Sequence, residues 1–172
     1  MACQARDLRV MKLEDARAFT QGQRVVYIYH NVVDTGAETA EDKTFDAVAE
    51  CIVELVDLVQ FCVNKLNASK VWVTADHGFL FQREALDATD RTVLNHMPAS
   101  VVKSKNRYVV RRELGVVPEA HYGNTDTTAG TVEGMDFWVP RAANRFHFGG
   151  GARYVHGGAM PQEVVVPLVT VT

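Results

Sequence analysis

A carboxylate, an imidazole and a glycine follow one another at Asp76, His77 and Gly78. They come directly after residues 71–74, a short apolar run rich in β-branched side chains that predicts a strand covered on both faces. Ligands of open α/β sheets bind outside the carboxyl ends of the strands. An oxygen ligand beside a nitrogen ligand at such a place indicates a divalent metal ion. The dipeptide alone favours a different interpretation, a helix-capping Asp followed by a surface His.

Ionisable residues also follow a second predicted strand, residues 24–29. His30 lies at its carboxyl end, and the segment after it, which we predict to be a loop, carries Asp34 and Glu38. A third candidate, His156, precedes two glycines on a predicted flexible turn. The chain therefore offers three places where nitrogen and oxygen ligands follow ordered segments.

A long helix is predicted between the two strands, beginning at the N-cap Thr44 and ending at Asn67. Its apolar residues recur at steps of three and four: Phe45, Val48, Ile52, Leu55, Val59, Cys62 and Leu66. Further apolar positions widen this surface, so we expect the helix to be mostly buried against a sheet. Leu55 is assigned to the buried side, and Glu54 to an acidic face that we expect to be solvated.

The order strand, helix, strand predicts a right-handed βαβ unit with parallel strands. The carboxyl ends of parallel strands meet at one edge of a sheet. Asp34, Asp76, His77 and His156 are therefore expected to lie together at that edge.

The flanking segments carry weaker patterns. A short helix is predicted at residues 13–19, and the first nine residues have no clear pattern. Residues 82–152 are rich in turn-forming residues and predict an irregular or antiparallel insertion, with strands at 108–112, 136–140 and 145–148. Its basic side chains, Arg107 among them, would either hold a phosphate or be exposed. Pro161 would open a helical turn before a valine-rich strand.

The overall composition excludes several classes. The 172 residues carry a net charge of −3, which gives no reason to expect a broad nucleic-acid-binding face. Three scattered cysteines predict a reducing compartment, and we expect a cytoplasmic protein. No apolar run is long enough to span a bilayer. No glycine-rich turn follows the strand at 24–29, which weighs against a dinucleotide-binding domain.

Three motifs together resemble a known family. They are Tyr27–Asp34 (Tyr-Ile-Tyr-His-Asn-Val-Val-Asp), Thr74–Leu80 (Thr-Ala-Asp-His-Gly-Phe-Leu), and His156-Gly157-Gly158 followed by Gln162-Glu163. Their order resembles the PglZ proteins of bacterial phage-defence systems (phage growth limitation and BREX), within the alkaline phosphatase superfamily. The resemblance covers residues 24–172.

The resemblance implies a centre with two divalent ions, often zinc, that holds a phosphate or sulfate ester. Asp76 and His77 would bind one ion. Asp34 and His156 would bind the other.

The chain departs from the superfamily pattern at two points. Where the superfamily often has a His four residues after the first Asp, this chain has Glu38, and His30 lies on the other side. A carboxylate there would favour manganese, magnesium or calcium over zinc. No strand before Arg24 ends in the Asp and Ser or Thr pair that supplies the superfamily's nucleophile.

We therefore predict an α/β fold over residues 1–172 with a parallel βαβ sheet core, resembling the second half of an alkaline-phosphatase-like domain. The implied function is metal-dependent hydrolysis of a phosphoester, in a nucleotide or nucleic acid, within a phage-defence system, and we expect this chain alone to be inactive. The alternative is a non-catalytic scaffold or interaction module. Partners would be other defence-system proteins, and the oligomeric state is open.

Overall fold

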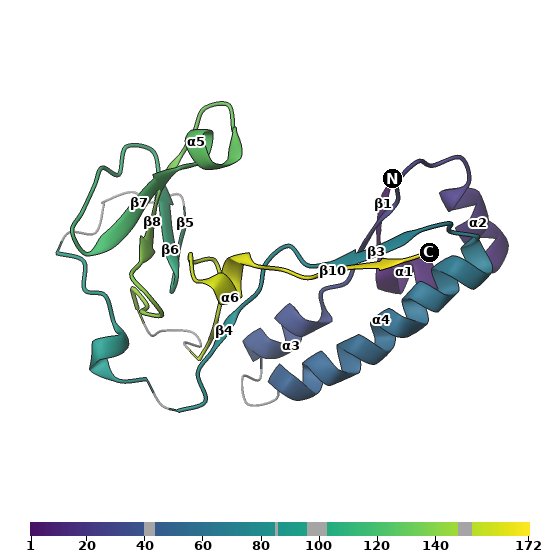
Figure 1. The fold of residues 1–172 in the computed structure, drawn as a ribbon, viewed down its shortest axis with the longest axis horizontal. Coiled ribbons are helices and arrows are strands. Elements are labelled where there is room, and N and C mark those ends of the chain that lie inside the picture. Colours follow the sequence, from purple (N-terminus) through teal and green to yellow (C-terminus); the bar gives the residue numbers. More distant parts are fainter. Residues whose placement is uncertain (40–43, 85, 96–102, 148–152) are drawn as a thin grey trace. The chain divides into compact units, whose positions relative to one another are not determined.

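The computed structural model describes residues 1–39, 44–84, 86–95, 103–147 and 153–172, with the backbone alone at 36–39 (Figure 1). The chain divides into two compact units. Unit 1 comprises Met1–Thr74 and Leu168–Thr172, and unit 2 comprises Ala75–Pro167. The chain thus leaves unit 1 after Thr74 and returns to it at Leu168. Among the described helices, none combines the length and apolar character that a bilayer span requires.

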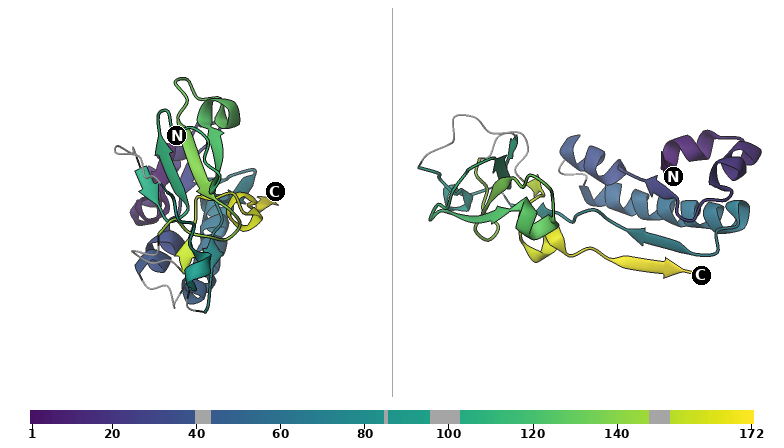
Figure 2. Two further views of the ribbon diagram at one scale, coloured as in Figure 1. Left: turned by 90° about the vertical axis from the view of Figure 1, so that its left-hand side faces the viewer. Right: turned by 90° about the horizontal axis from the view of Figure 1, so that it is seen from above.

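Unit 1 contains helices along one side of two short sheets (Figures 1 and 2). Its elements are β1 (Ala2–Gln4), α1 (Ala5–Val10), α2 (Leu13–Thr20), β2 (Tyr27–Tyr29), α3 (Val32–Thr39), α4 (Thr44–Leu66), β3 (Val71–Thr74) and β10 (Leu168–Val171). β1 pairs with β2 in parallel, and β3 pairs with β10 antiparallel. The strand and helix in the first ten residues were not predicted, because their sequence has no clear period.

The predicted parallel βαβ core is not what the described residues form. β2 and β3 are the two strands that were expected to pair, but each has a different partner and lies in a separate sheet. The described residues form a mixed α/β fold with several small sheets, most of them antiparallel. The strand β2 is also shorter than the predicted 24–29.

The segment predicted as a loop after β2 is helical, as α3. The backbone N–H and the hydroxyl of Thr35 both donate to the carbonyl oxygen of Asn31, at 3.2 and 3.0 Å, which closes the first turn. Asp34 lies in that turn, where its negative charge is favourable. Gly36 and the β-branched residues lower the local helix propensity, and packing of α3 against α4 overrides that preference.

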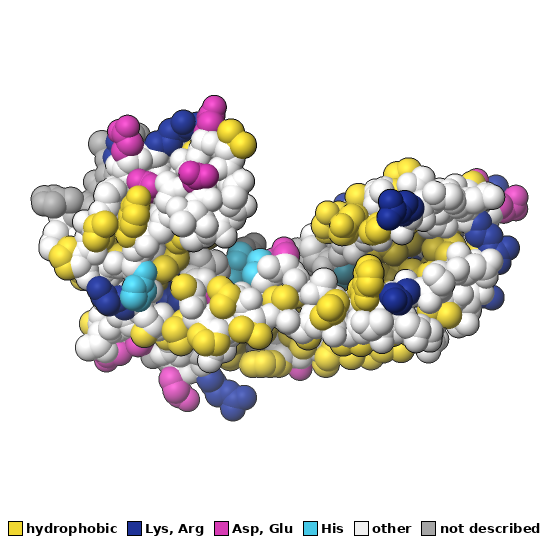
Figure 3. Space-filling view, turned by 45° about the horizontal axis from the view of Figure 1, so that its top comes forward, with side chains coloured by type: hydrophobic (Ala, Val, Ile, Leu, Met, Phe, Trp, Pro, Cys, Tyr) yellow, Lys and Arg dark blue, Asp and Glu magenta, His cyan; other side chains and the backbone are white. Residues whose placement is uncertain are grey.

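The long helix is confirmed as α4, and Asn67 ends it in the left-handed conformation with φ 57°. Its predicted burial is only partly correct. Leu58 and Cys62 are buried with Leu8 and Ala16, but Ile52 is 56% exposed. Figure 3 shows exposed hydrophobic side chains gathered over unit 1. The described elements of unit 1 cover one face of α4 and leave the rest in contact with solvent.

Replacement of Leu58 by Ala is expected to lower the stability of unit 1 by about 2–5 kcal/mol, because the side chain is 6% exposed and a cavity would remain. Val53 is 63% exposed on the same helix, so Val53→Ala is the matched control and should cost less than about 0.5 kcal/mol. Denaturant unfolding followed by helical circular dichroism measures both. Equal losses would mean that Leu58 does not belong to the core.

Unit 2 is built around a four-stranded antiparallel sheet in the order β5-β6-β8-β7. Its elements are β4 (Leu80–Phe81), a 3₁₀ helix (Ala88–Asp90), β5 (Lys103–Lys105), β6 (Tyr108–Arg111), β7 (Ala120–Asn124), α5 (Thr125–Ala129), β8 (Asp136–Pro140), β9 (Tyr154–Val155) and α6 (Pro161–Val164). The strands at 108–111 and 136–140 and the helical turn at Pro161 are confirmed. At 145–148, the described residues show an isolated bridge from Arg145 to Arg91 in place of a strand, and Phe148 lies outside them. The predicted boundaries of an insertion at 82–152 stay a prediction.

A two-stranded pair sets the position of the two histidine turns in unit 2. β4 and β9 run antiparallel, with Leu80 opposite Val155. His77 precedes β4 and His156 follows β9, so the antiparallel register brings both residues to the same end of the pair. The last part of the predicted valine strand is confirmed as β10. Its first residue, Val164, belongs instead to α6.

Candidate metal centre

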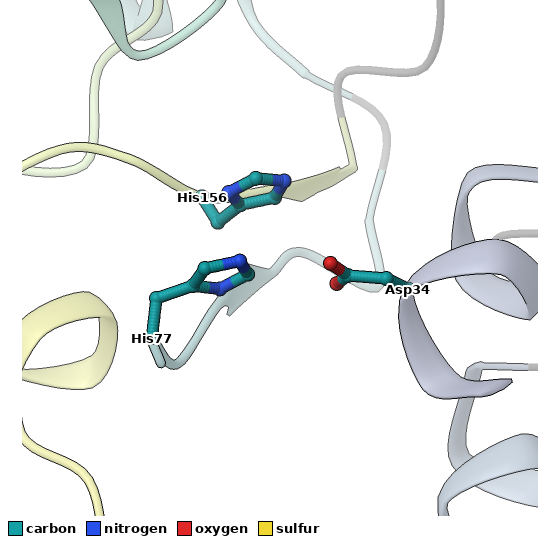
Figure 4. A group of neighbouring side chains, drawn as sticks. All are labelled: Asp34, His77 and His156. Atoms are coloured by element: carbon teal, nitrogen blue, oxygen red, sulfur yellow. The ribbon is translucent and has the colours of Figure 1, made fainter. Parts of the chain in front are cut away.

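The imidazole rings of His77 and His156 lie face to face in unit 2 (Figure 4). Their centroids are 4.1 Å apart and their planes differ by 2°. A nitrogen of each ring lies within 4.8 Å of a nitrogen of the other. Both side chains are half-buried, so the pair is neither sealed in the core nor fully solvated. Two of the predicted ligands are therefore brought together.

The orientation of His77 is fixed by its own turn. Its Nδ1 lies 3.0 Å from the carbonyl oxygen of Gly78. A carbonyl oxygen only accepts, so this bond places a hydrogen on Nδ1 and, in the neutral ring, the lone pair on Nε2. Asp76 lies beside it: Oδ1 accepts from the backbone N–H of His77 at 3.0 Å and is 3.9 Å from Nε2. A carboxylate oxygen and an imidazole nitrogen are thus presented together.

The stacked rings limit how the two histidines can bind metal. An ion bound to imidazole lies near the plane of the ring, about 2.0–2.1 Å from the nitrogen. Parallel planes do not intersect, so one ion cannot lie in both. The stack therefore favours two ions, one for each ring, as in two-metal sites.

Glu163 connects the turns that carry both histidines. Its carboxylate is fully buried and receives two parallel bonds from Arg107, Nε to Oε1 at 2.9 Å and Nη2 to Oε2 at 2.6 Å. The backbone N–H groups of Gly158 and Met160 also donate to it, at 2.9 and 3.1 Å. Its own carbonyl oxygen accepts from the N–H of Gly78 at 2.9 Å.

The surroundings of Glu163 act on its pKa in opposite directions. Burial raises the pKa, since the charged form loses its hydration. The hydrogen bonds from Arg107, Gly158 and Met160 and the charge of Arg107 outweigh burial and hold the pKa below its ordinary value. Glu163 is therefore ionised at neutral pH.

Neighbouring backbone requires glycine at Gly78. Its φ lies outside the left-handed region, so conformational freedom is not the reason. A Cβ there would collide with the carbonyl group of Gln162, which is backbone and cannot swing aside. The turn after His77 is thus packed directly on the start of α6.

The remaining predicted ligands lie in unit 1. Asp34, the third residue labelled in Figure 4, is half-buried in the first turn of α3. Glu38 lies in the same helix, and its side chain is outside the described residues. The roles of all six predicted residues as metal ligands stay predictions: Asp34, Asp76, His77, His156, Glu38 and His30.

His30 has partners at both ring nitrogens. Nε2 is 2.8 Å from the carboxylate of Glu54, and Nδ1 is 3.5 Å from the sulfur of Cys51. Burial, and then the charge of Glu54, raise the pKa of the Cys51 thiol, so the thiol keeps its proton and can donate it to Nδ1. Glu54, predicted to be solvated, keeps 45% of its side chain exposed and is also bonded to His30. His30 and Glu54 line a cavity of about 710 Å³ in unit 1, which is within the size range of small-molecule sites.

The residues that sequence reasoning missed are Arg107 and Glu163. Arg107 was grouped with basic residues expected to bind phosphate or to be exposed, but it is fully buried and committed to Glu163. The two residues are 56 positions apart, and no local pattern relates them. One feature of the sequence could have indicated that Glu163 belongs to the site: it follows the His-Gly-Gly turn within the third motif.

Comparison with known families decides the affiliation. Residues 1–171 match the family model described as "BREX system PglZ alkaline phosphatase-like domain". The chain belongs to the PglZ family. This confirms the resemblance carried by the three motifs and extends it to the first residues of the chain.

Two curated PglZ relatives match nearly the whole chain. The "Alkaline phosphatase-like protein BrxZ" of Escherichia coli O9:H4 (strain HS) is 41% identical over 173 residues, and the "Alkaline phosphatase-like protein PglZ" of Bacillus cereus (strain H3081.97) is 37% identical over 171 residues. These alignments cover 99% and 98% of this chain. The chain spans 20% of the length of each relative. No solved structure matches it significantly.

Proposed function

We propose that this chain supplies part of a two-metal centre of a phosphoester hydrolase that acts in a BREX-type phage-defence system. The observation that carries the proposal is the parallel stack of His77 on His156, 4.1 Å apart. The bond from His77 Nδ1 to Gly78 adds support, because metal-binding histidines typically donate their other N–H to a carbonyl or carboxylate oxygen.

In the proposed centre, His77 and Asp76 hold one ion, and His156 holds the other with Asp34 and Glu38 of α3. The ions are zinc, or manganese, magnesium or calcium where the carboxylates dominate. Two such ions would stabilise the attacking and leaving oxygens of an in-line displacement at phosphorus. We propose the hydrolysis, its substrate and the defence-system partners for the whole protein. This chain spans 20% of the length of the curated relatives.

The chain is expected to bind zinc, and replacement of His77 or His156 by Ala should each reduce the affinity by at least about 10-fold, because changes to groups that merely support a ligand already cost that much. His121 is exposed in the same unit, so His121→Ala is the matched control. Isothermal titration calorimetry with zinc, manganese, magnesium and calcium measures the affinity. Equal binding by all variants would refute the metal centre.

Activity tests the second part of the proposal. The chain alone is expected to give no metal-dependent turnover of a chromogenic phosphate monoester or diester, since no nucleophile is assigned in it. A PglZ protein of full length should hydrolyse one of them, and lose that activity when the residue equivalent to His77 is changed. Metal binding without hydrolysis in the full-length protein would favour the scaffold interpretation.

A further inference from the structure

The ion pair between Arg107 and Glu163 has an unusual place in unit 2. Arg107 directly precedes β6, a strand of the four-stranded sheet, and its side chain has no exposed surface. Its third nitrogen, Nη1, donates to the carbonyl oxygen of Asn144. Glu163 is 2% exposed and lies in α6, outside the sheet. The pair therefore attaches α6 to the sheet through a bidentate, charge-assisted contact.

The side chain and the backbone of Glu163 contact two different turns. The side chain accepts from the N–H of Gly158, two residues after His156. The backbone carbonyl accepts from the N–H of Gly78, one residue after His77. A shift of Glu163 would thus move both histidine turns.

Close packing leaves those turns little freedom. A Cβ at Gly157 would meet the ring of Tyr108, and a Cβ at Gly158 would meet the guanidinium of Arg107 and the carboxylate of Glu163. The turn after His156 is therefore in direct contact with the ion pair and with the first residue of β6. Its position depends on that pair.

Energetics favour a geometric role for the pair. Taking two charges out of water costs about as much as their pairing returns, and a buried pair can often be replaced by apolar residues with no loss of stability. An apolar substitute could not accept hydrogen bonds from the N–H groups of Gly158 and Met160. It also could not be held in place by the planar guanidinium group of Arg107. The pair thus contributes defined positions more than net stability.

We propose that Glu163, held by Arg107, is a positioning residue that sets the spacing of His77 and His156 by bonding to the turns after both. The proposal rests on the proposed function for its purpose, that each ring receives its own ion. The spacing itself is a property of the metal-free chain and can be tested without metal.

The test uses the whole chain with Glu163→Gln and Arg107→Lys. Gln has one oxygen, so two of the four donors around the carboxylate would face an amide N–H₂ group. A lysine ammonium cannot span both oxygens as the guanidinium fork does. Glu133→Gln is the matched control, because Glu133 also pairs with an arginine, Arg112, at 2.7 Å but is 70% exposed.

Two measurements separate the outcomes. Proton NMR of the histidine rings without metal reports stacking, because each ring shifts the signals of the ring above it. Zinc affinity reports ligand positions. Both variants are expected to lose the stacking shifts of His77 and His156 and to bind zinc about 10- to 100-fold more weakly, with amide signals of the four-stranded sheet unchanged. The control should match the wild type in both.

Unchanged ring signals in both variants would overturn the proposal. So would loss of the sheet signals in both, because the pair would then hold the whole unit and not two turns. If the wild type binds no zinc and the ring signals still respond as expected, the proposed function fails and the positioning role stands.

Discussion

Replacement of Arg107 by Met is expected to lower the stability of unit 2 by about 3–5 kcal/mol, the typical cost of breaking a buried ion pair from one side. The carboxylate of Glu163, which has no exposed side-chain surface, would remain buried without its counter-charge. Met replaces the aliphatic part of the Arg107 side chain but has neither its charge nor its bonds to Glu163. Fluorescence of the buried Trp138 follows unfolding of unit 2, in a Trp72→Phe background that removes the signal of unit 1.

Two comparisons test the origin of this loss. In Arg107→Met with Glu163→Gln, the uncompensated charge is gone, so part of the stability should return. The return should be incomplete, since Gln cannot accept from both Gly158 and Met160 as the carboxylate does. No recovery in the double variant would mean that Arg107 acts through packing.

Acidification provides the second comparison. The pKa of Glu163 is depressed in the folded chain, so its contribution is present above the unfolded value of about 4.3 and is lost as the pH falls through the folded pKa. In Arg107→Met, burial acts on Glu163 without the opposing cation, and the group can protonate more readily. The stability difference between wild type and variant should therefore shrink as the pH falls, because Glu163 protonates first in the variant and then, at lower pH, in the wild type.

Local sequence patterns predicted the elements better than their pairing. The helix α4 begins at Thr44 and ends before Asn67, close to the bounds that its local sequence predicted, because end signals depend on neighbouring residues. The partner of β3 is β10, which lies far later in the chain, and no pattern within β3 encodes that choice. A parallel partner was expected because the two nearest strands flank a helix, and that rule does not hold among the described residues.

In the candidate site, too, the sequence indicated the residue types but not the contacts between distant residues. The types of Asp76, His77 and His156 and their glycine neighbours indicated metal chemistry from the sequence, and the structure stacks the two imidazoles. What holds the stack could not be predicted, since Arg107 and Glu163 are ordinary charged residues until their burial is known. Burial depends on the packing of β6 against α6, which is a property of the fold.

Replacement of Gly78 by Ala is expected to displace the His77 turn. The new Cβ would collide with the backbone carbonyl of Gln162, so the bond from the N–H of residue 78 to Glu163 must lengthen or break. Forcing one methyl group into such packing typically costs about 1–3 kcal/mol. Because His77 bonds to the carbonyl of the same residue, zinc affinity should also fall, by at least about 10-fold.

A second glycine supplies the control for that substitution. Gly130 follows α5 with φ 63°, and a Cβ there would meet no other atom within 4 Å. Gly130→Ala should cost about 1–2 kcal/mol through backbone strain alone and leave zinc affinity unchanged. Thermal unfolding would then show similar losses for both variants, and zinc titration would separate them. Equal zinc affinity in Gly78→Ala and Gly130→Ala would show that close packing of Gly78 on Gln162 does not position His77, and that the turn can move without consequence for the metal ligands.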